Sequence, residues 1–152
     1  MTVQVAERDA REIAAIMPIM ESAFHPEYGE AWTAAQCLSL LATPGTSLIT
    51  AEMGGVVTGF ALTRWVFDEE ELLMIGVAPE FQRMGIAGNL AARIIARAKA
   101  SNRKRIFLEV RSNNPARHFY LQLGFADCGV RKAYYRGSNG NRFDATTMAL
   151  DL

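Results

Sequence analysis

The spacing of apolar residues in the first part of the chain predicts two helices. Five of them follow one another at intervals of 3, 1, 3 and 4 positions, which places them on one face of a helix over about residues 9–24. They are Ile13, Ile16, Met17, Met20 and Phe24. Pro18 lies within this segment and predicts a kink or a break, because proline supplies no N–H to the helix. A second helix is expected to begin at Thr33, since Thr33 and Gln36 fit a capping box, and to end at Pro44.

Runs of β-forming residues, separated by turn signals, predict seven strands. Their expected ranges are 2–6, 47–52, 56–67, 71–78, 105–111, 125–131 and 142–150. Two further helices are expected over residues 85–100 and 114–123, the second with Pro115 at its first position and Gly124 at its end. The resulting order, β-α-α-β-β-β-α-β-α-β-β, predicts one α/β domain over residues 1–152 with a single mixed sheet.

The composition argues against several classes of partner. The 152 residues carry 16 basic and 16 acidic side chains, and the basic cluster at 103–105 is short, so no nucleic-acid partner is expected. No apolar run reaches the roughly 18 residues of a membrane span, and residues 1–11 lack the apolar core of a signal peptide. We therefore expect a cytoplasmic location and no membrane partner. Cys37 and Cys128 show no metal or redox spacing, so no metal site is expected.

A glycine-bearing segment, residues 82–88, follows the apolar run 72–77 and opens the third helix. The first N–H groups of a helix have no internal partner, and the helix dipole adds partial positive charge there. Neither the dinucleotide fingerprint nor the P-loop is present in the segment. What remains is a Gln-x-x-Gly-x-Ala pattern, met by Gln82, Gly85 and Ala87, which predicts a phosphate or pyrophosphate ligand. The alternative is a glycine-bearing turn into a surface helix.

This segment resembles the acetyl-CoA pyrophosphate loop of the GNAT acetyltransferase superfamily. Later motifs are similar to those of the RimI-type N-terminal acetyltransferases: Leu-Glu-Val-Arg at 108–111, Ser-Asn at 112–113, Tyr120, Leu-Gly-Phe at 123–125, Tyr-Tyr at 134–135 and Asp-Ala-x-x-Met-x-Leu at 144–150. The resemblance implies a GNAT fold, with a mixed, mostly antiparallel sheet of six to seven strands flanked by about four helices. It also implies acetyl-CoA as donor and, as acceptor, the N-terminal α-amine of a protein, in that family an alanine of a ribosomal small-subunit protein.

The resemblance further implies a donor site built from a strand end and the loop. The residues implied to bind acetyl-CoA are Ile75, Gly76, Val77, Gln82, Arg83, Met84, Gly85, Ile86, Ala87, Gly88, Asn113 and Tyr120. Strands that splay at 75–77 would leave backbone N–H groups free for the pantetheine arm and the thioester oxygen. Gly76 fits a bulge or close ligand approach there, or else a packing position. Asn113 is also a candidate helix cap.

Two catalytic roles follow from the same resemblance. Glu109, near the end of a central strand, is the candidate base, and the alternative is a strand carboxylate paired with a neighbouring arginine. The acidic residues at 69–71 are runners-up for the base. Tyr120 is the candidate donor of a hydrogen bond to the leaving thiolate, with packing within its helix as the alternative. The family usually has one more residue between Arg111 and Ser112, and its absence here could shift Glu109 relative to the cleft.

Aromatic residues are the candidates for the acceptor site. Phe24, Trp32, Tyr134 and Tyr135 are implied to wall the cleft, and only one of the two tyrosines is expected to face it, since neighbours in a strand point to opposite sides. The two histidines, His25 and His118, match no family site and are expected to be structural or at the surface.

Three functions stay open at this point. They are an N-terminal acetyltransferase, a GNAT enzyme that acts on a small-molecule amine, and an acetyl-CoA-binding domain without turnover. A monomer or a weak dimer is expected.

Overall fold

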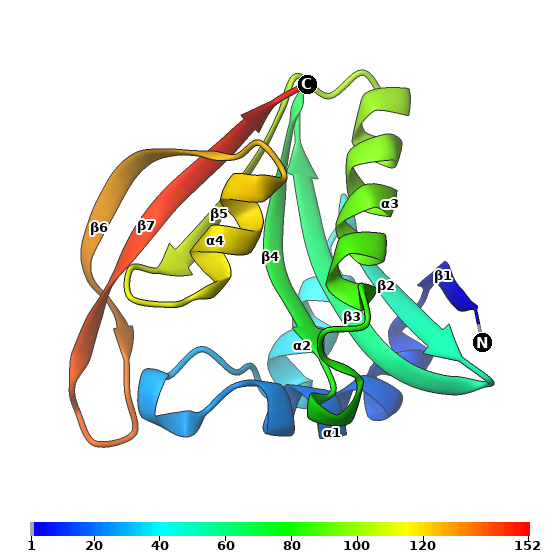
Figure 1. The fold of residues 1–152 in the computed structure, drawn as a ribbon, viewed down its shortest axis with the longest axis horizontal. Helices are drawn as coiled ribbons and strands as arrows, with labels where there is room; N and C mark the ends of the chain where they lie inside the picture. The colour runs from blue at the N-terminus through cyan, green and yellow to red at the C-terminus, as the bar shows by residue number, and fades with distance from the viewer. Residues whose placement is uncertain (1) are drawn as a thin grey trace.

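Seven strands form one sheet, in the order β1-β2-β3-β4-β5-β7-β6, in the computed structural model, which describes residues 2–152 (Figure 1). β4 and β5 run parallel, and every other neighbouring pair is antiparallel. The α/β class and the mixed, mostly antiparallel sheet are therefore confirmed. The strands are β1 (Val3–Arg8), β2 (Thr46–Met53), β3 (Val56–Val66), β4 (Glu69–Val77), β5 (Arg105–Arg111), β6 (Ala126–Arg136) and β7 (Arg142–Asp151).

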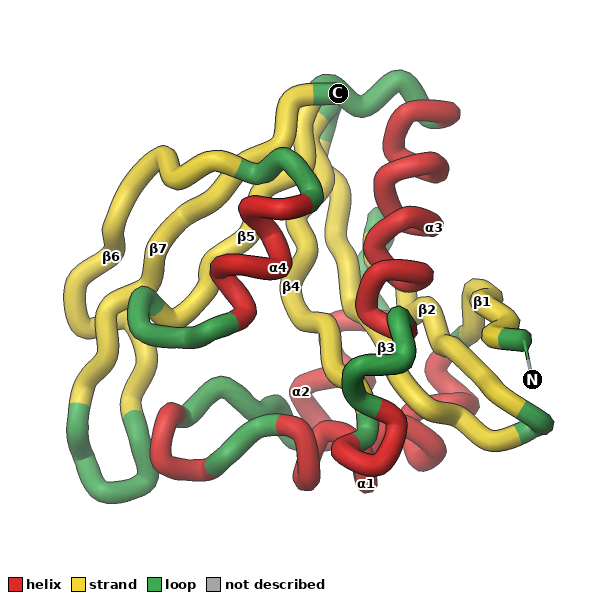
Figure 2. The backbone as a smooth tube through the Cα atoms, viewed as in Figure 1, coloured by secondary structure: helices red, strands yellow, loops and turns green. Residues whose placement is uncertain are grey.

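Helices cover both faces of this sheet (Figure 2). α1 (Ile13–Ala23) and α2 (Ala34–Leu41) pack on one face, and α3 (Ile86–Ala100) and α4 (Ala116–Gln122) pack on the other. Alternate residues of the central strands enter different cores: Phe60 joins the α1 side and Ala61 the α3 side. None of the helices within residues 2–152 is long and apolar enough to cross a membrane.

The helices α1 and α2 test two local sequence signals, an internal proline and a capping box. Pro18 lies inside α1, which continues through it, so the expected break does not occur. The buried face of α1, with Ile16 and Met20 fully enclosed, holds the helix in place despite the missing N–H. The expected capping box of α2 is confirmed, because Thr33 Oγ1 accepts from Gln36 N at 3.1 Å and Gln36 Oε1 accepts from Thr33 N at 2.7 Å.

β4 and β5 are paired over only part of their length. Residues 69–72 of β4 pair with residues 105–108 of β5, and beyond that point the described part of the chain shows no pairing between the two strands. The register between β3 and β4 shifts at this point, because Met74 pairs with Leu62 whereas Leu72 pairs with Thr63. The extra residue is Leu73, and a bulge of this kind bends the strand that carries it. The two strands therefore diverge and leave an opening in the middle of the sheet.

The paired end of β4 is held by a buried ion pair that the sequence did not indicate. Glu70, treated above as a runner-up base, has a side chain only 1% exposed. Its Oε2 accepts from Arg97 Nη2 of α3 at 2.6 Å, and Arg97 also donates to Thr63 Oγ1 and Ser47 Oγ at 2.9 Å. Glu70 therefore fixes α3 onto β4 and is not available as a base. β4 begins at Glu69, two residues before its expected start, because Glu69 and Glu70 pair with both β3 and β5.

We predict that Glu70→Gln lowers the free energy of unfolding by about 3 kcal/mol, because Arg97 is left with a largely buried charge whose closest partner is gone. Urea denaturation measures the change. Glu69→Gln is the matched control: the Glu69 side chain is 44% exposed, and its substitution is expected to cost no more than about 0.5 kcal/mol. Equal losses in the two variants would contradict the structural role given to Glu70.

Candidate active site

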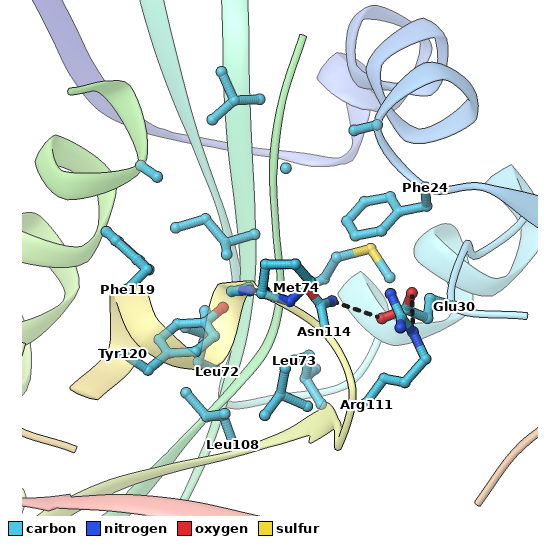
Figure 3. Close-up of a pocket in the computed structure, with 18 of the residues that line it drawn as sticks. Phe24, Glu30, Leu72, Leu73, Met74, Leu108, Arg111, Asn114, Phe119 and Tyr120 are labelled. Atoms are coloured by element: carbon cyan, nitrogen blue, oxygen red, sulfur yellow. Dashed lines mark hydrogen bonds and ion pairs between the residues drawn. The ribbon is translucent and has the colours of Figure 1, made fainter. Parts of the chain in front are cut away.

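A cavity of about 930 Å³ opens where β4 and β5 diverge (Figure 3). It is bounded by the ends of both strands, the start of α3, one side of α4, the α1–α2 connection and β6. The predicted site residues that line it are Phe24, Trp32, Ile75, Gly76, Val77, Gln82, Arg83, Gly85, Ile86, Ala87, Gly88, Glu109, Tyr120, Tyr134 and Tyr135. The sequence motifs, although spread from residue 24 to residue 135, thus meet around one opening.

Two predicted site residues do not lie on this cavity. Met84 is half-exposed at the tip of the loop before α3 and is not among the lining residues. Asn113 is exposed, and its Oδ1 accepts from Arg111 Nη1 at 2.6 Å. The neighbouring residue has the capping role expected of Asn113: Asn114 lines the cavity, and its Oδ1 accepts from Ala116 N at 2.9 Å at the start of α4.

The loop before α3 has the geometry of an anion cradle. Gly85 is the N-cap of the 15-residue helix, has φ +78° and provides no side-chain cap, so the first N–H groups of α3 face the cavity mouth. Arg83 also adopts a left-handed φ, +64°, which a non-glycine residue rarely does. A Cβ at Gly85 would meet nothing within 4 Å. The space above the helix N-terminus is thus open to an incoming phosphate.

Gly76 serves packing. A Cβ there would lie 3.0 Å from Phe60 Cε1 and 3.1 Å from Phe24 Cε2, so the glycine lets two aromatic rings approach the strand. The bulge considered at this position lies three residues earlier, at Leu73. Close packing of Phe24 against β4 in turn places the α1–α2 connection beside the cavity.

Glu109 lies on the free part of β5, with its side chain 12% exposed and bordering the cavity. Its Oε2 accepts from Thr147 Oγ1 at 2.7 Å, and its Oε1 is 3.4 Å from Arg131 Nη1. The shortened link after Arg111 therefore does not remove Glu109 from the cleft. The arginine that pairs with it comes from β6, and not from the two arginines of its own strand.

Tyr120 combines a packed ring with a place on the cavity wall. The residue is 7% exposed, and its ring makes edge contacts with Phe119 and Phe125 at centroid distances of 5.2 and 5.8 Å. Burial, with a smaller contribution from the negative charge of Glu30, raises the pKa of the Tyr120 phenol well above its usual value. The phenol therefore remains protonated and can donate a hydrogen bond, but it is a weak acid.

Both Tyr134 and Tyr135 border the cavity, so the expectation that only one of them faces it is wrong. The alternation of side chains fails because the β6–β7 register shifts between Arg131 and Tyr135 and because Ala133 has φ +53°. The two rings meet edge to face at 4.9 Å, and the Tyr135 hydroxyl donates to the backbone oxygen of Glu109 at 3.2 Å. Burial, followed by the charge of Glu30, raises the pKa of Tyr135 above its usual range.

A charged group in the cavity wall was missed by sequence reasoning. Arg111, 6% exposed, donates from Nε to Glu30 Oε1 at 3.2 Å, and its guanidinium lies 3.5 Å from the centre of the Tyr28 ring. Asn114 Nδ2 donates to the other oxygen of Glu30 at 3.3 Å. Figure 3 shows Arg111, Glu30 and Asn114 side by side. The only sequence signal was position, since Glu30 lies between Phe24 and Trp32.

The two loops that flank the acceptor side are in direct contact. Ser138 N, in the β6–β7 turn, donates to Pro26 O of the α1–α2 connection at 3.2 Å. A Cβ at Gly29 would lie 1.9 Å from Arg136 O, and one at Gly137 would lie 1.9 Å from Glu27 O. Only glycine fits at either position. The contact joins the two loops, which lie side by side in Figure 1.

The histidines take no part in a metal site. His118 is exposed on α4. His25 lies at the cavity rim, where its Nδ1 accepts from Glu27 N at 3.1 Å. Within the described residues, no group of three or more histidine, cysteine, aspartate or glutamate side chains is placed to hold a metal ion.

Comparison with known proteins assigns a family to this geometry. The profile of the Acetyltransferase (GNAT) family matches residues 13–125. A [ribosomal protein bS18]-alanine N-acetyltransferase of Haemophilus influenzae is 36% identical over 96 residues, which cover 63% of this chain and 66% of that protein. The N-alpha-acetyltransferase RimI of Mycobacterium tuberculosis is 34% identical over 125 residues, 79% of this chain and 75% of that protein. The crystal structure of the Escherichia coli ribosomal-protein-S18-alanine N-acetyltransferase superposes with a TM-score of 0.87 at 27% identity, covering 99% of this chain and 94% of that one.

We predict that Gly29→Ala lowers the free energy of unfolding by about 2–4 kcal/mol, since a left-handed alanine costs roughly 1–2 kcal/mol and the overlap with Arg136 O roughly as much again. Gly140→Ala is the control, because Gly140 also has a positive φ but a Cβ there meets nothing within 4 Å. Urea denaturation of both variants separates the two contributions. If Gly140→Ala costs as much as Gly29→Ala, the loop contact is not a tight one.

Proposed function

Because the chain belongs to the Acetyltransferase (GNAT) family, we propose that it transfers the acetyl group of acetyl-CoA to the N-terminal α-amine of a protein. The observation that carries the acceptor part of this proposal is the contact between the α1–α2 connection and the β6–β7 turn. With Gly29 against Arg136 O and Gly137 against Glu27 O, an extended chain has no open groove to cross, so a chain end is favoured as the acceptor. The names of the similar enzymes of Haemophilus influenzae and Escherichia coli support an alanine of a ribosomal small-subunit protein as the acceptor residue.

The residues present fit the donor. The N-terminus of α3 and the open space at Gly85 suit the pyrophosphate, with Gln82, Arg83 and Ala87 around it. On the side facing β5, residues 73–77 of β4 have no strand partner within residues 2–152. Val77 O accepts from Gln82 Nε2 at 3.3 Å, and the backbone groups of the residues before it suit an amide-bearing arm and the thioester oxygen. Acetyl-CoA, when bound, supplies an acetyl group already activated as a thioester.

Glu109 is the proposed base. An N-terminal amine has an ordinary pKa near 7.8, so its neutral form at pH 7 costs about 1 kcal/mol, whereas a lysine near 10.4 costs about 4.6 kcal/mol. A carboxylate that accepts the proton through a water molecule is sufficient for the first case. The neutral amine, present once the ammonium proton is lost to solvent, bonds through its nitrogen to the thioester carbonyl carbon. The carbon–sulfur bond then breaks, the sulfur leaves as a thiolate, and the proton that the nitrogen loses passes through water to Glu109.

Tyr120 is the proposed partner of the leaving sulfur. Its buried phenol stays protonated, so it offers a hydrogen bond that stabilises the thiolate without having to give up the proton. Phe24, Trp32, Tyr134 and Tyr135 form the wall on the acceptor side. Their apolar surface suits the first side chains of a peptide.

We expect acetylation, detected by mass spectrometry, of a peptide with a free N-terminal alanine and no lysine. A second peptide with a blocked N-terminus and internal lysines should remain unmodified under the same conditions, because its amines are costlier to deprotonate and must enter past the closed side of the cavity. Modification of the lysine peptide alone would contradict the proposal. Modification of neither peptide, with acetyl-CoA still bound, would favour a small-molecule amine or a binding domain without turnover.

Glu109→Gln is expected to lower kcat by about 100-fold or more while acetyl-CoA affinity stays unchanged, because the variant keeps the shape of the side chain but accepts no proton. Steady-state kinetics and calorimetric titration with acetyl-CoA measure the two quantities. Glu80→Gln, an exposed carboxylate outside the cavity, is the control and should behave as the unmodified enzyme. An unchanged kcat in Glu109→Gln would exclude Glu109 as the base.

A further inference from the structure

Glu30 is bonded through both of its carboxylate oxygens. Oε1 accepts from Arg111 Nε at 3.2 Å and Oε2 accepts from Asn114 Nδ2 at 3.3 Å. The Glu30 side chain is 12% exposed and the Arg111 side chain 7% exposed, so the pair is shielded from water. Both oxygens of Glu30 are thus engaged by residues of the cavity wall, and these contacts hold the side chain in one place.

The partners of Glu30 belong to the two elements that carry the proposed catalytic groups. Arg111 follows Glu109 by two residues on β5, so the two side chains share a face of the strand. Asn114 uses its oxygen to bond Ala116 N at the start of α4, the helix that carries Tyr120. Glu30 itself lies in the connection between α1 and α2, beside Trp32. One side chain thus connects the acceptor side of the cavity to both catalytic elements.

A second contact of the same loop strengthens this connection. The Tyr28 ring lies under the Arg111 guanidinium at 3.5 Å and meets the Phe143 ring of β7 edge to face at 5.3 Å. Both Glu30 and Tyr28 therefore converge on Arg111 from a loop that is separated from it by more than 80 positions in the chain. Residues 26–30 are held across the cavity edge by these contacts and by the turn at Ser138.

Resting on the function proposed above, we propose that Glu30 is a positioning residue: it ties the acceptor loop, residues 26–32, to the strand of Glu109 and the helix of Tyr120, so that the acceptor wall is in place before the acceptor binds. A loop that is already ordered does not lose conformational entropy when the acceptor binds, so binding is stronger. Loss of the tie should therefore appear mainly as weaker acceptor binding. The donor site at the N-terminus of α3 shares no contact with this group and should be unaffected.

The test is Glu30→Gln, assayed with the alanine peptide. KM for the peptide is expected to rise about tenfold or more, equivalent to about 1.4 kcal/mol of lost binding, with kcat less affected and acetyl-CoA affinity within about twofold of the unmodified enzyme. Glu27→Gln is the matched control in the same loop, since the Glu27 side chain is 48% exposed and is paired only with His25. A peptide KM unchanged in Glu30→Gln, or raised equally in Glu27→Gln, would overturn the proposal.

Tyr28→Leu gives a second route if Glu30→Gln does not fold, because it removes the ring on Arg111 without unpairing a buried charge. It should likewise raise the peptide KM. Amide hydrogen exchange supplies a readout that does not depend on turnover: exchange in residues 26–32 should accelerate in Glu30→Gln or Tyr28→Leu while α3 stays protected. If the unmodified enzyme acetylates no N-terminal peptide, the proposed function fails, and hydrogen exchange alone then tests whether Glu30 holds residues 26–32 in place. Unchanged exchange in these residues would overturn the proposed role of Glu30.

Discussion

The divergence of β4 and β5 is the constraint on which the rest of the structure depends. A parallel pair that stops after residue 72 leaves backbone N–H and C=O groups in the middle of a sheet without strand partners, and such groups are costly unless water or a ligand satisfies them. The opening persists because both sides are fixed. Glu70 and Arg97 hold the paired end, the Leu73 bulge bends β4 away, and aromatic rings fill the space on either face. Phe24 and Phe60 pack against β4 at Gly76, and Tyr120 packs with Phe125 beside β5.

The same divergence explains why one cavity can take two substrates from different directions. The start of α3 lies at one mouth, where Gly85 leaves the helix N-terminus open. The α1–α2 connection and β6 line the cavity elsewhere, next to the contact at Gly29 and Gly137 that no larger residue allows. Between them run the free backbone edge of β4 and the free end of β5 with Glu109. On the function proposed above, donor and acceptor meet along this gap.

Local and periodic signals in the sequence were enough to predict the elements, and the resemblance to GNAT motifs supplied most of the candidate site residues. The helical face of α1, the Thr33 capping box and the glycine-bearing loop are all encoded by residues within a few positions of one another. The contacts that sequence reasoning missed join residues far apart: Glu70 meets Arg97 across 27 positions and Glu30 meets Arg111 across 81. No local pattern marks such a pair, because each partner alone looks like an ordinary surface charge. The tyrosines of β6 were misjudged for a related reason, since the positive φ of Ala133 breaks the alternation on which the prediction rested.

Two of the carboxylates that line the cavity, Glu30 and Glu109, differ in the partners that they bind. Glu30 spends both oxygens on Arg111 and Asn114, deep in the wall. Glu109 accepts one short bond from Thr147, and its other oxygen faces Arg131 at 3.4 Å, an arginine whose side chain is 59% exposed. An exposed arginine at that distance holds a carboxylate weakly, which suits the base role proposed for Glu109. The loop that carries Glu30 is held by side-chain contacts, whereas the strand that carries Glu109 is held by its pairing with β7. The proposed base is therefore positioned by the backbone of β5, and the proposed acceptor wall by the contacts of Glu30.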